Sequence, residues 1–479
     1  MRNRGRSLAA AMVRCTASLC TYVGIAVIAC GTATAQEIEG SQPALSRPNL
    51  LSQRWQEDWS ALADPTSRTE PLDALKYIPL SDDGSAYLSF GANARERVEY
   101  LDAALFGVAE RKSNTYLLDR LEVNAELRVD GWQAFVQLED EQAPGKISVG
   151  PADADMFDLE QAFISHVANI GDGVLKVRVG RQEMAFDLER FVSTRDGPNV
   201  RQAFDALWGD YELGDWRVIS FASHPTQYRD NAAFDDYSAR NLILDGFRIE
   251  RRGIGPGNLA VYYLRYQNDT AHFAGATGRE GLNAVDIHYN ASIGGASLDG
   301  EVMGQQGTIA GRPVLAWAFG GKLGYAFAGL TWKPSPYLQI DAASGNMSKN
   351  GTFGTFNPLF PNGSYFSLAS LTSYANLIHV KPAIIAEPTK TLTLQAALGL
   401  QWRETTNDAV YTIPTQAVPN TAGHGHLWSA AYLQLIASQR INEHVTVSLE
   451  TTRYQVGATI REAGGHDATY AMVQAAIAW

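Results

Sequence analysis

Cysteine is nearly absent from the 479-residue sequence, and its three copies, Cys15, Cys20 and Cys30, all precede residue 31. Long apolar runs are missing as well, because no stretch of ~18 apolar residues follows residue 35. The first absence excludes a disulfide framework in the rest of the chain. The second excludes a polytopic helical membrane protein. Because the sequence also lacks cofactor motifs and ligand spacings typical of metal sites, we expect neither a cofactor nor a metal.

Lysine and net positive charge are also scarce. The sequence has 39 basic and 51 acidic residues, a formal net charge of −12, and only nine of the basic residues are lysine. This balance argues against a nucleic-acid partner. The excess of arginine favours planar, bidentate contacts over solvated point charges. Disorder is excluded by the 45% hydrophobic and 10% aromatic content, which can form a buried core.

The first 35 residues have the pattern of a signal peptide. Four arginines precede an apolar stretch at 17–30, and Ala33-Thr34-Ala35 provides a small-residue cleavage site. Cleavage there would remove four positive charges and take the net charge from −12 to −16. A second alternative stays open, since residues 27–30 also resemble a lipoprotein box that would place an acyl chain on Cys30.

From residue 86 onward the sequence alternates apolar and polar residues in segments of about ten, as strands with one apolar and one polar face do. Segments 86–100 and 120–129 show this best. Tight connections are expected at 130–131, 168–173, 212–215, 251–258, 294–295, 333–336, 387–391 and 439–444. Longer connections are expected between them, at 101–114, 141–156, 183–199, 223–238, 268–283, 307–313, 346–371, 404–424 and 455–467. Eight short and nine long connections in alternation give 18 strands.

A soluble β-sandwich is the alternative, but it has no physical reason to sort its connections by length, whereas outer-membrane barrels do. A sheet that spans lipid must also close, because unpaired backbone groups in hydrocarbon cost free energy. The sequence therefore predicts an all-β fold: a closed antiparallel transmembrane β-barrel of about 18 strands over 86–479, with short periplasmic turns and long extracellular loops. It would lie in the outer membrane of a Gram-negative bacterium. Residues 36–85 either extend into the periplasm or lie in the barrel mouth.

Several motifs resemble those of the alginate-export family of outer-membrane barrels, from about Arg54 to the C-terminus. The motifs are RWQEDWS at 54–60, LKYIPL at 75–80, RERVE at 95–99, VGRQE at 179–183, NVR at 199–201 with Phe204-Asp205, ASGN at 343–346 and TFNPLFP at 355–361. The resemblance implies an 18-stranded barrel that exports an anionic polysaccharide through an arginine-lined constriction. This sequence departs from that pattern, because its predicted inner faces mix arginine with about as many carboxylates.

Strand alternation assigns a set of polar side chains to the lumen. These expected pore-lining residues are Arg95, Arg97, Glu99, Arg120, Glu122, Glu126, Arg128, Glu139, Lys176, Arg178, Gln182, Arg201, Asp205, Arg265, Glu301 and Arg403. Arg181 and Arg190 belong to a loop, or its base, that would constrict the channel if it folded inward. The arginines either guide an anionic solute or pair with the acids and brace the wall. The aromatic loop at 346–371 is expected to act as a lid, or else to stack on a sugar.

The leading functional hypothesis is a passive channel for export or conduction of an anionic polysaccharide or oligosaccharide such as alginate. The alternative is an uptake porin for small organic acids or sugars. A barrel hydrolase is a third class, but no nucleophile elbow or zinc motif occurs, and Ser165 and His166 are adjacent and face opposite ways. We therefore expect that the protein is not an enzyme.

The expected partners are outer-membrane lipid, the solute and, as an open alternative, a periplasmic scaffold docking at 36–85.

Overall fold

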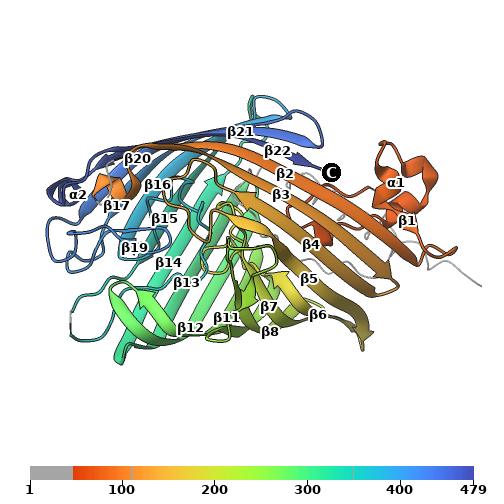
Figure 1. Ribbon diagram of the computed structural model, residues 1–479, viewed down its shortest axis with the longest axis horizontal. Helices are drawn as coiled ribbons and strands as arrows, with labels where there is room; N and C mark the ends of the chain where they lie inside the picture. The colour runs from red at the N-terminus through yellow and green to blue at the C-terminus, as the bar shows by residue number, and fades with distance from the viewer. Residues whose placement is uncertain (1–46, 109–111, 349) are drawn as a thin grey trace, which may run out of the picture.

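The computed structural model describes residues 47–108, 112–348 and 350–479, so the predicted signal peptide lies outside the described residues. Eighteen long antiparallel strands of this part form a closed barrel (Figure 1), which confirms the predicted fold. No helix in the described part of the chain is long and apolar enough to cross a membrane. The strands are β2 (Ala86–Leu101), β3 (Asn114–Val129), β4 (Trp132–Gln142), β5 (Asp155–Ile170), β6 (Gly173–Glu183), β7 (Ala203–Leu213), β8 (Trp216–Gln227), β10 (Leu242–Ile254), β11 (Gly257–Phe273), β12 (Ala276–Ile293), β13 (Ala296–Ile309), β14 (Arg312–Tyr325), β15 (Ser335–Ala343), β16 (Leu377–Ala386), β17 (Leu392–Trp402), β20 (Trp428–Arg440), β21 (Val445–Val456) and β22 (Ala468–Ala478).

Shorter elements lie before, between and after these strands. They are η2 (Arg54–Gln56), η3 (Ser60–Ala63), η4 (Pro65–Ser67), α1 (Asp73–Lys76), β1 (Ile78–Pro79), η5 (Ala104–Gly107), β9 (Tyr237–Ser238), β18 (Tyr411–Thr412), β19 (Gln416–Ala417) and α2 (Ala458–Glu462).

The barrel closes where the first long strand meets the last. β2 pairs antiparallel with β22, with Val98 opposite Val473. Beyond the end of β22, the backbones of Ala92 and Trp479 exchange two hydrogen bonds of 2.8 Å. Within the described residues the barrel sheet therefore presents no unpaired edge, as a lipid environment requires.

The outward face of the barrel is apolar. Val98, Leu121, Ile164 and other aliphatic side chains at alternate strand positions are exposed there. Exposed aromatic side chains lie beside the short turns and form a girdle at the periplasmic end, as in other outer-membrane barrels. They are Trp132, Trp216, Tyr325 and Trp332.

Two of the expected long loops are instead tight turns of projecting hairpins. β11 and β12 extend through most of 268–283 and meet at Ala274-Gly275, and β13 and β14 meet at Ala310-Gly311. All four turn residues have positive φ, between 46° and 81°. This geometry is typical of the two-residue turns that match the twist of paired strands, and glycine at the second position adopts it without steric strain. On the periplasmic side, the turn predicted at 333–336 is longer and spans 326–334.

The segment that precedes β2 packs at the periplasmic end, where α1 and the C-terminus lie (Figure 1). Trp55 is buried against Phe135 and Phe163 of the inner wall. The Arg54 guanidinium donates a hydrogen bond of 2.8 Å to the Trp479 carbonyl. The Lys76 ammonium lies 4.5 Å from the centre of the Trp479 ring. These contacts place residues 47–79 in the barrel mouth and against the closing seam.

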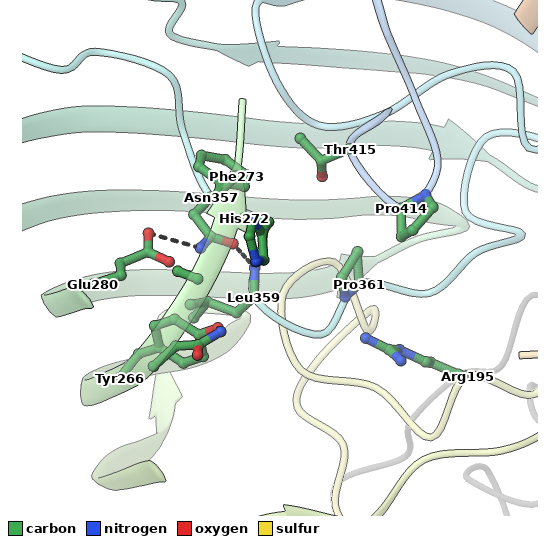
Figure 2. Close-up of a pocket in the computed structure, with 12 residues that line it drawn as sticks. Arg195, Tyr266, His272, Phe273, Glu280, Asn357, Leu359, Pro361, Pro414 and Thr415 are labelled. Atoms are coloured by element: carbon green, nitrogen blue, oxygen red, sulfur yellow. Dashed lines mark hydrogen bonds between the residues drawn. The ribbon is translucent and has the colours of Figure 1, made fainter. Parts of the chain in front are cut away.

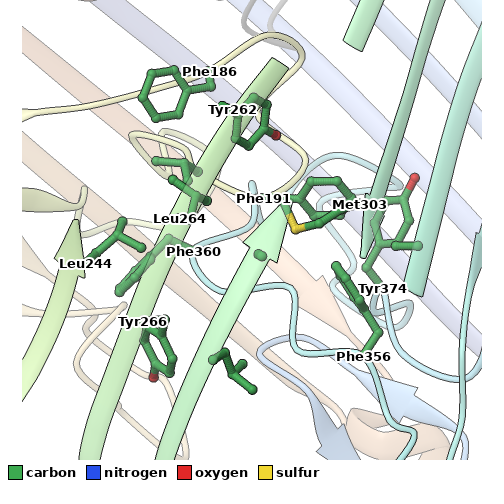
Figure 3. Packing of buried hydrophobic residues seen from close by; sticks show 14 of the residues in the cluster. Phe186, Phe191, Leu244, Tyr262, Leu264, Tyr266, Met303, Phe356, Phe360 and Tyr374 are labelled. Atoms are coloured by element: carbon green, nitrogen blue, oxygen red, sulfur yellow. The ribbon is translucent and has the colours of Figure 1, made fainter. Parts of the chain in front are cut away.

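Two long loops, 184–202 and 344–376, fold into the lumen and supply much of an internal hydrophobic core (Figure 3). Phe191 of the first loop packs on Phe356 of the second, with ring centres 5.2 Å apart. The two loops also form a parallel bridge between Val192 and Phe360. Inner-face residues of β11 and β13, such as Tyr262, Leu264 and Met303, complete this core. The inner face of β11 is therefore apolar where it meets the loops.

Candidate channel constriction

Loop 184–202 crosses the lumen and is fixed to opposite walls. At one side, the buried guanidinium of Arg190 forms ion pairs of 2.8 Å with Asp299 and 2.9 Å with Glu301, both on β13. It also donates to the hydroxyl of Tyr365 in the second inward loop, at 2.8 Å. Arg190 therefore ties the first loop both to the wall and to the second loop. Arg190 lies in this inward loop, and its part in narrowing the channel stays a prediction.

At the other side, the loop covers a pair of like charges. Arg95 of β2 and Arg120 of β3 are direct cross-strand neighbours on the inner face, an arrangement that repulsion disfavours unless acceptors surround it. The loop provides those acceptors. Both guanidinium groups donate to the carbonyls of Asp196 and Pro198, with distances between 2.7 and 3.4 Å.

Asp196 is the centre of what we name the Asp196 cluster, formed by Asp196, Arg95, Arg120 and Arg201. Its carboxylate lies 2.6 Å from the Arg201 guanidinium, 2.8 Å from that of Arg120 and 3.8 Å from that of Arg95. Burial opposes its ionisation, but the three guanidinium groups outweigh burial and hold the pKa of Asp196 well below its usual range. The Asp196 side chain is nevertheless 50% exposed. A charged carboxylate is thus presented to the lumen beside three cations.

The arginines of the cluster are held by further contacts. Arg201 also forms a two-point ion pair with buried Glu183, with 2.9 Å between Nη2 and Oε2. Asn199, fully buried, donates its side-chain amide to the carbonyls of Asp119, Gln142 and Asp153 at 2.9–3.1 Å. Neither Asp196 nor Asn199 was among the residues expected from strand alternation. The NVR motif at 199–201 was the one sequence signal near them.

Most of the expected lumen residues do lie on the inner face of their strands. The inward set, besides the cluster, comprises Arg97, Glu99, Glu122, Glu126, Arg128, Glu139, Lys176, Arg178, Gln182 and Glu301. Several of them pair with one another along or across strands: Arg97 lies 2.9 Å from Glu99, and Arg128 lies 2.7 Å from Glu126. Such pairs stiffen the wall and leave few free charges.

Three predicted positions are wrong, because their side chains lie on the outward face. Arg181 and Asp205 are cross-strand neighbours that pair at 3.1 Å, on the same face as lipid-facing Val179 and Leu207. Arg265 pairs with Asp245, again on the outward face, while the inward positions of β11 hold Tyr262, Leu264 and Tyr266. Arg181 lies on strand β6, before the loop in which it was expected to narrow the channel. For Asp205 and Arg265 the reason is the inward loops. Where they pack on the wall, the inner face is apolar, so polarity alone assigns the faces in the wrong sense.

Arg403 is buried, but it anchors a loop. Its guanidinium donates to the carbonyls of Asp408, Thr421 and His426, at 2.9, 2.6 and 2.6 Å. These bonds fold residues 404–426 over the extracellular end of β17. Arg403 therefore positions this loop rather than facing open lumen.

The aromatic rings of loop 344–376 are enclosed. Phe356, Phe360 and Tyr365 are all buried, and Phe360 packs edge-on against Phe204 with ring centres 5.2 Å apart. This arrangement fits the expected lid rather than a surface on which a sugar stacks. Glu189 of the first loop accepts a hydrogen bond of 3.2 Å from Asn362 of the second. Burial raises the pKa of Glu189 to about 8, and the neighbouring charge of Asp196 adds to this rise.

A small cavity of about 140 Å³ lies between the inward loops and the β11–β12 hairpin (Figure 2). The Asn357 side chain donates its amide to Glu280 at 3.1 Å, and its Oδ1 accepts from the Leu359 backbone N–H at 2.9 Å. Tyr266, Phe273 and Arg195 complete a lining of mixed polarity. The cavity offers room for a small polar solute beside the constriction.

Comparisons with known proteins agree with this architecture. A family model described as "Alginate export" matches residues 86–474. No curated protein matches the sequence. Among solved structures, OccD3 (OpdP) of Pseudomonas aeruginosa is 12% identical, covering 82% of this chain and 91% of its own, with a TM-score of 0.54. OccAB1 of Acinetobacter baumannii is 11% identical (85% and 99% covered, TM-score 0.54). P. aeruginosa OccK2 (OpdF), solved in complex with glucuronate, is 11% identical (82% and 96% covered, TM-score 0.52).

Proposed function

The chain belongs to the alginate-export family of outer-membrane β-barrels, and from this premise we propose that it conducts an anionic polysaccharide or oligosaccharide through the Asp196 cluster. Its family and fold are those of outer-membrane channels rather than enzymes.

The observation that carries the proposal is the half-exposed carboxylate of Asp196 among three guanidinium groups. A carboxylate of a uronate residue has the same charge and geometry as the Asp196 side chain. It can therefore exchange with Asp196 as the partner of Arg120 and Arg201, which offer paired N–H donors. Charge acts strongly on a solute inside the narrow, low-dielectric lumen.

The inner wall supports both interpretations of the arginines. Arg97, Arg120 and Arg201 are almost fully buried and bonded to acids or loop carbonyls, so they brace the inward loop. The contacts of Arg120 and Arg201 also hold their charges beside the exposed carboxylate of Asp196. Bracing and guiding are thus performed by one set of residues at the constriction.

A second candidate is an uptake channel for small organic acids or sugars. Two inward loops narrow the lumen, which favours a small solute over a polymer. Two structures with the same fold bear titles naming small carboxylates: OccK2 with glucuronate and OpdK with vanillate. Their low identity supports the fold alone, so this candidate depends on the loops.

Current block in planar bilayers tests the proposal. We expect uronate oligosaccharides to interrupt the ionic current, whereas neutral oligosaccharides of equal length do not. Asp196→Asn should lengthen each block, because the competing carboxylate is gone. Asp215→Asn, on an exposed periplasmic turn, is the matched control. Equal block by neutral and uronate oligosaccharides would refute the anionic substrate. Block by monouronates but not by oligomers would favour the uptake candidate.

A further inference from the structure

A group of buried acids lies near the extracellular end of the β4–β5 hairpin, outside the Asp196 cluster. We name it the carboxylate cluster: Glu139 and Glu141 of β4, Asp155 and Asp158 of β5, and Asp236 of the loop before β9. One oxygen each of Glu139, Glu141 and Asp155 lie within 4.8 Å of one another. The same is true of Asp155, Asp158 and Asp236. Asp155 belongs to both groups.

The hairpin gathers these acids through irregular strand pairing. The β4–β5 register shifts twice, once after Gln137 and once between Glu139 and Glu141. As a result Asp155 and Asp158, three residues apart, both point inward, which a regular strand does not allow. Bulges of this kind redirect side chains and are frequent beside functional sites.

The carboxylate of Asp155 faces Asp236 and other acids rather than a hydrogen-bond donor among the described residues. Its side chain is 0% exposed, and neither of its oxygens accepts a hydrogen bond there. Glu141 is equally buried, and neither of its oxygens accepts a hydrogen bond in the described part of the chain. The Arg120 guanidinium, 3.9 Å from Glu141, is already bonded to Asp196 and to loop carbonyls.

Buried carboxylates without partners are unfavourable unless something neutralises them. Protons or a cation can do so. Five acids share this small volume, so removal of negative charge from it is favourable.

We propose that the carboxylate cluster binds a divalent cation, Ca²⁺, with Asp155 as the shared ligand. All candidate ligands are carboxylate oxygens, which suit a hard cation and not the nitrogen and sulfur preference of zinc. Ca²⁺ binds oxygens at about 2.3–2.6 Å, so ligands on opposite sides of the ion lie about 4.6–5.2 Å apart. The oxygens of each triad lie within 4.8 Å of one another, so a single ion can contact all three. Mg²⁺ usually keeps several waters and binds through one or two carboxylates, so a site made of several carboxylates suits it less well.

A bound ion would join three separate parts of the chain: β4, β5 and the loop that carries Asp236. The same end of the hairpin provides the Gln142 and Asp153 carbonyls that hold Asn199 of the constricting loop. The ion would therefore stabilise the support of that loop. This inference does not depend on which solute the channel conducts.

Calorimetric titration of the EDTA-treated, detergent-solubilised protein with CaCl2 tests the inference. We expect saturable binding near neutral pH, weaker binding of MgCl2, and affinity for Ca²⁺ reduced at least about tenfold in Asp155→Asn. The matched control is Asp286→Asn, because Asp286 is equally buried, and neither of its oxygens has a hydrogen-bond partner among the described residues, but it belongs to no such acid group. Its affinity for Ca²⁺ should equal that of the wild type.

Two results would overturn the proposal: no saturable heat up to about 10 mM CaCl2, well above the range of ordinary protein calcium sites, or unchanged affinity in the Asp155 variant. Proton uptake by the cluster without calcium binding would show that protons neutralise it instead. If Asp155→Asn fails to fold, Asp236→Asn replaces it, since Asp236 lies in a loop outside the barrel strands. Unchanged affinity in that variant would then count against the site.

Discussion

At the scale of single residues, the constriction is built around two neighbouring arginines. Carbonyl groups of an inward loop offset the repulsion between their charges. Arg95 and Arg120 stand side by side on the inner face, and carbonyls of loop 184–202 surround them. Asp196 adds a carboxylate that is shared by three arginines and half exposed. Exchange of this carboxylate with a solute is the chemical step that we propose.

Replacement of Asp196 by asparagine tests its role as counter-charge. The variant keeps the size of the side chain and removes one negative charge beside three arginines. We expect a shift of the reversal potential toward stronger anion preference, measured in planar bilayers under a KCl gradient. Asp215→Asn, on an exposed turn, should leave the reversal potential unchanged. A shift toward cation preference in the Asp196 variant would contradict the assignment.

From the raised pKa of Glu189 we predict that gating of the channel depends on pH. Its pKa of about 8 exceeds the ordinary glutamate value, so the folded protein binds more protons than the unfolded chain between about pH 4.5 and 8. Stability contributed by protonated Glu189 is therefore lost as pH rises through 8. We expect more frequent gating of the single-channel current above pH 8 than at pH 6.

Glu189→Gln is the matched variant for this prediction. Glutamine keeps an oxygen acceptor toward Asn362 and cannot ionise. Gating in the variant should be independent of pH over the same range. If the variant gates as the wild type does above pH 8, another group is responsible.

Strand alternation predicted individual residues well only where the inner face is polar. On β2 and β3 it placed Arg95, Arg97 and Arg120 correctly. On β7 and β11 it failed for Asp205 and Arg265, because aromatic side chains face inward there to meet the loops. The role of Asp196 could not be predicted from the residues next to it in the sequence. Its environment depends on Arg95, which lies 101 residues away.

At the scale of elements, the two inward loops are one structural unit. They share the Val192–Phe360 bridge, the Glu189–Asn362 hydrogen bond and the Arg190–Tyr365 hydrogen bond. The sequence could predict their length and their aromatic content. The direction in which they fold is set by buried contacts with distant strands, which no local pattern encodes.

Replacement of Arg190 by alanine should release this unit from β13. Breaking a buried ion pair by removing one partner typically costs about 3–5 kcal/mol, because the remaining charge stays buried. Glu301 and Asp299 would be left with weaker partners. We expect a larger single-channel conductance. Arg453→Ala, which removes an exposed guanidinium, is the control and should not change conductance.

At the scale of the whole molecule, closure and the apolar outer band fit the protein to a membrane. Closure of the sheet and the outward aliphatic residues were predictable, because lipid imposes them on any barrel. The number of strands followed from the alternation of short and long connections. The interior was less predictable, since it depends on how loops and wall pack. The projecting hairpins at 274–275 and 310–311 are a further case, where glycine-containing segments continued as strand.

The loss of folding free energy caused by a new charge on the outward face should depend on how deep the substituted position lies in the membrane. Val302 is exposed on the outward face of β13, and Val302→Arg would place a charge against lipid. Such a change costs about 2–4 kcal/mol at mid-membrane and about 0–1 kcal/mol near the interface. Leu330→Arg, in the periplasmic turn 326–334, is the interface counterpart. Unfolding by denaturant in lipid vesicles should show a clear loss of stability for the first variant only; equal losses would contradict the assigned orientation.

The most direct test of the central claim is the reversal potential of the purified mature protein in a planar bilayer under a KCl gradient. The account predicts stepwise single-channel currents and a potential whose sign shows that chloride passes more readily than potassium. Absence of current steps would contradict the channel, and a potential of the opposite sign would contradict selection of anions at the Asp196 cluster.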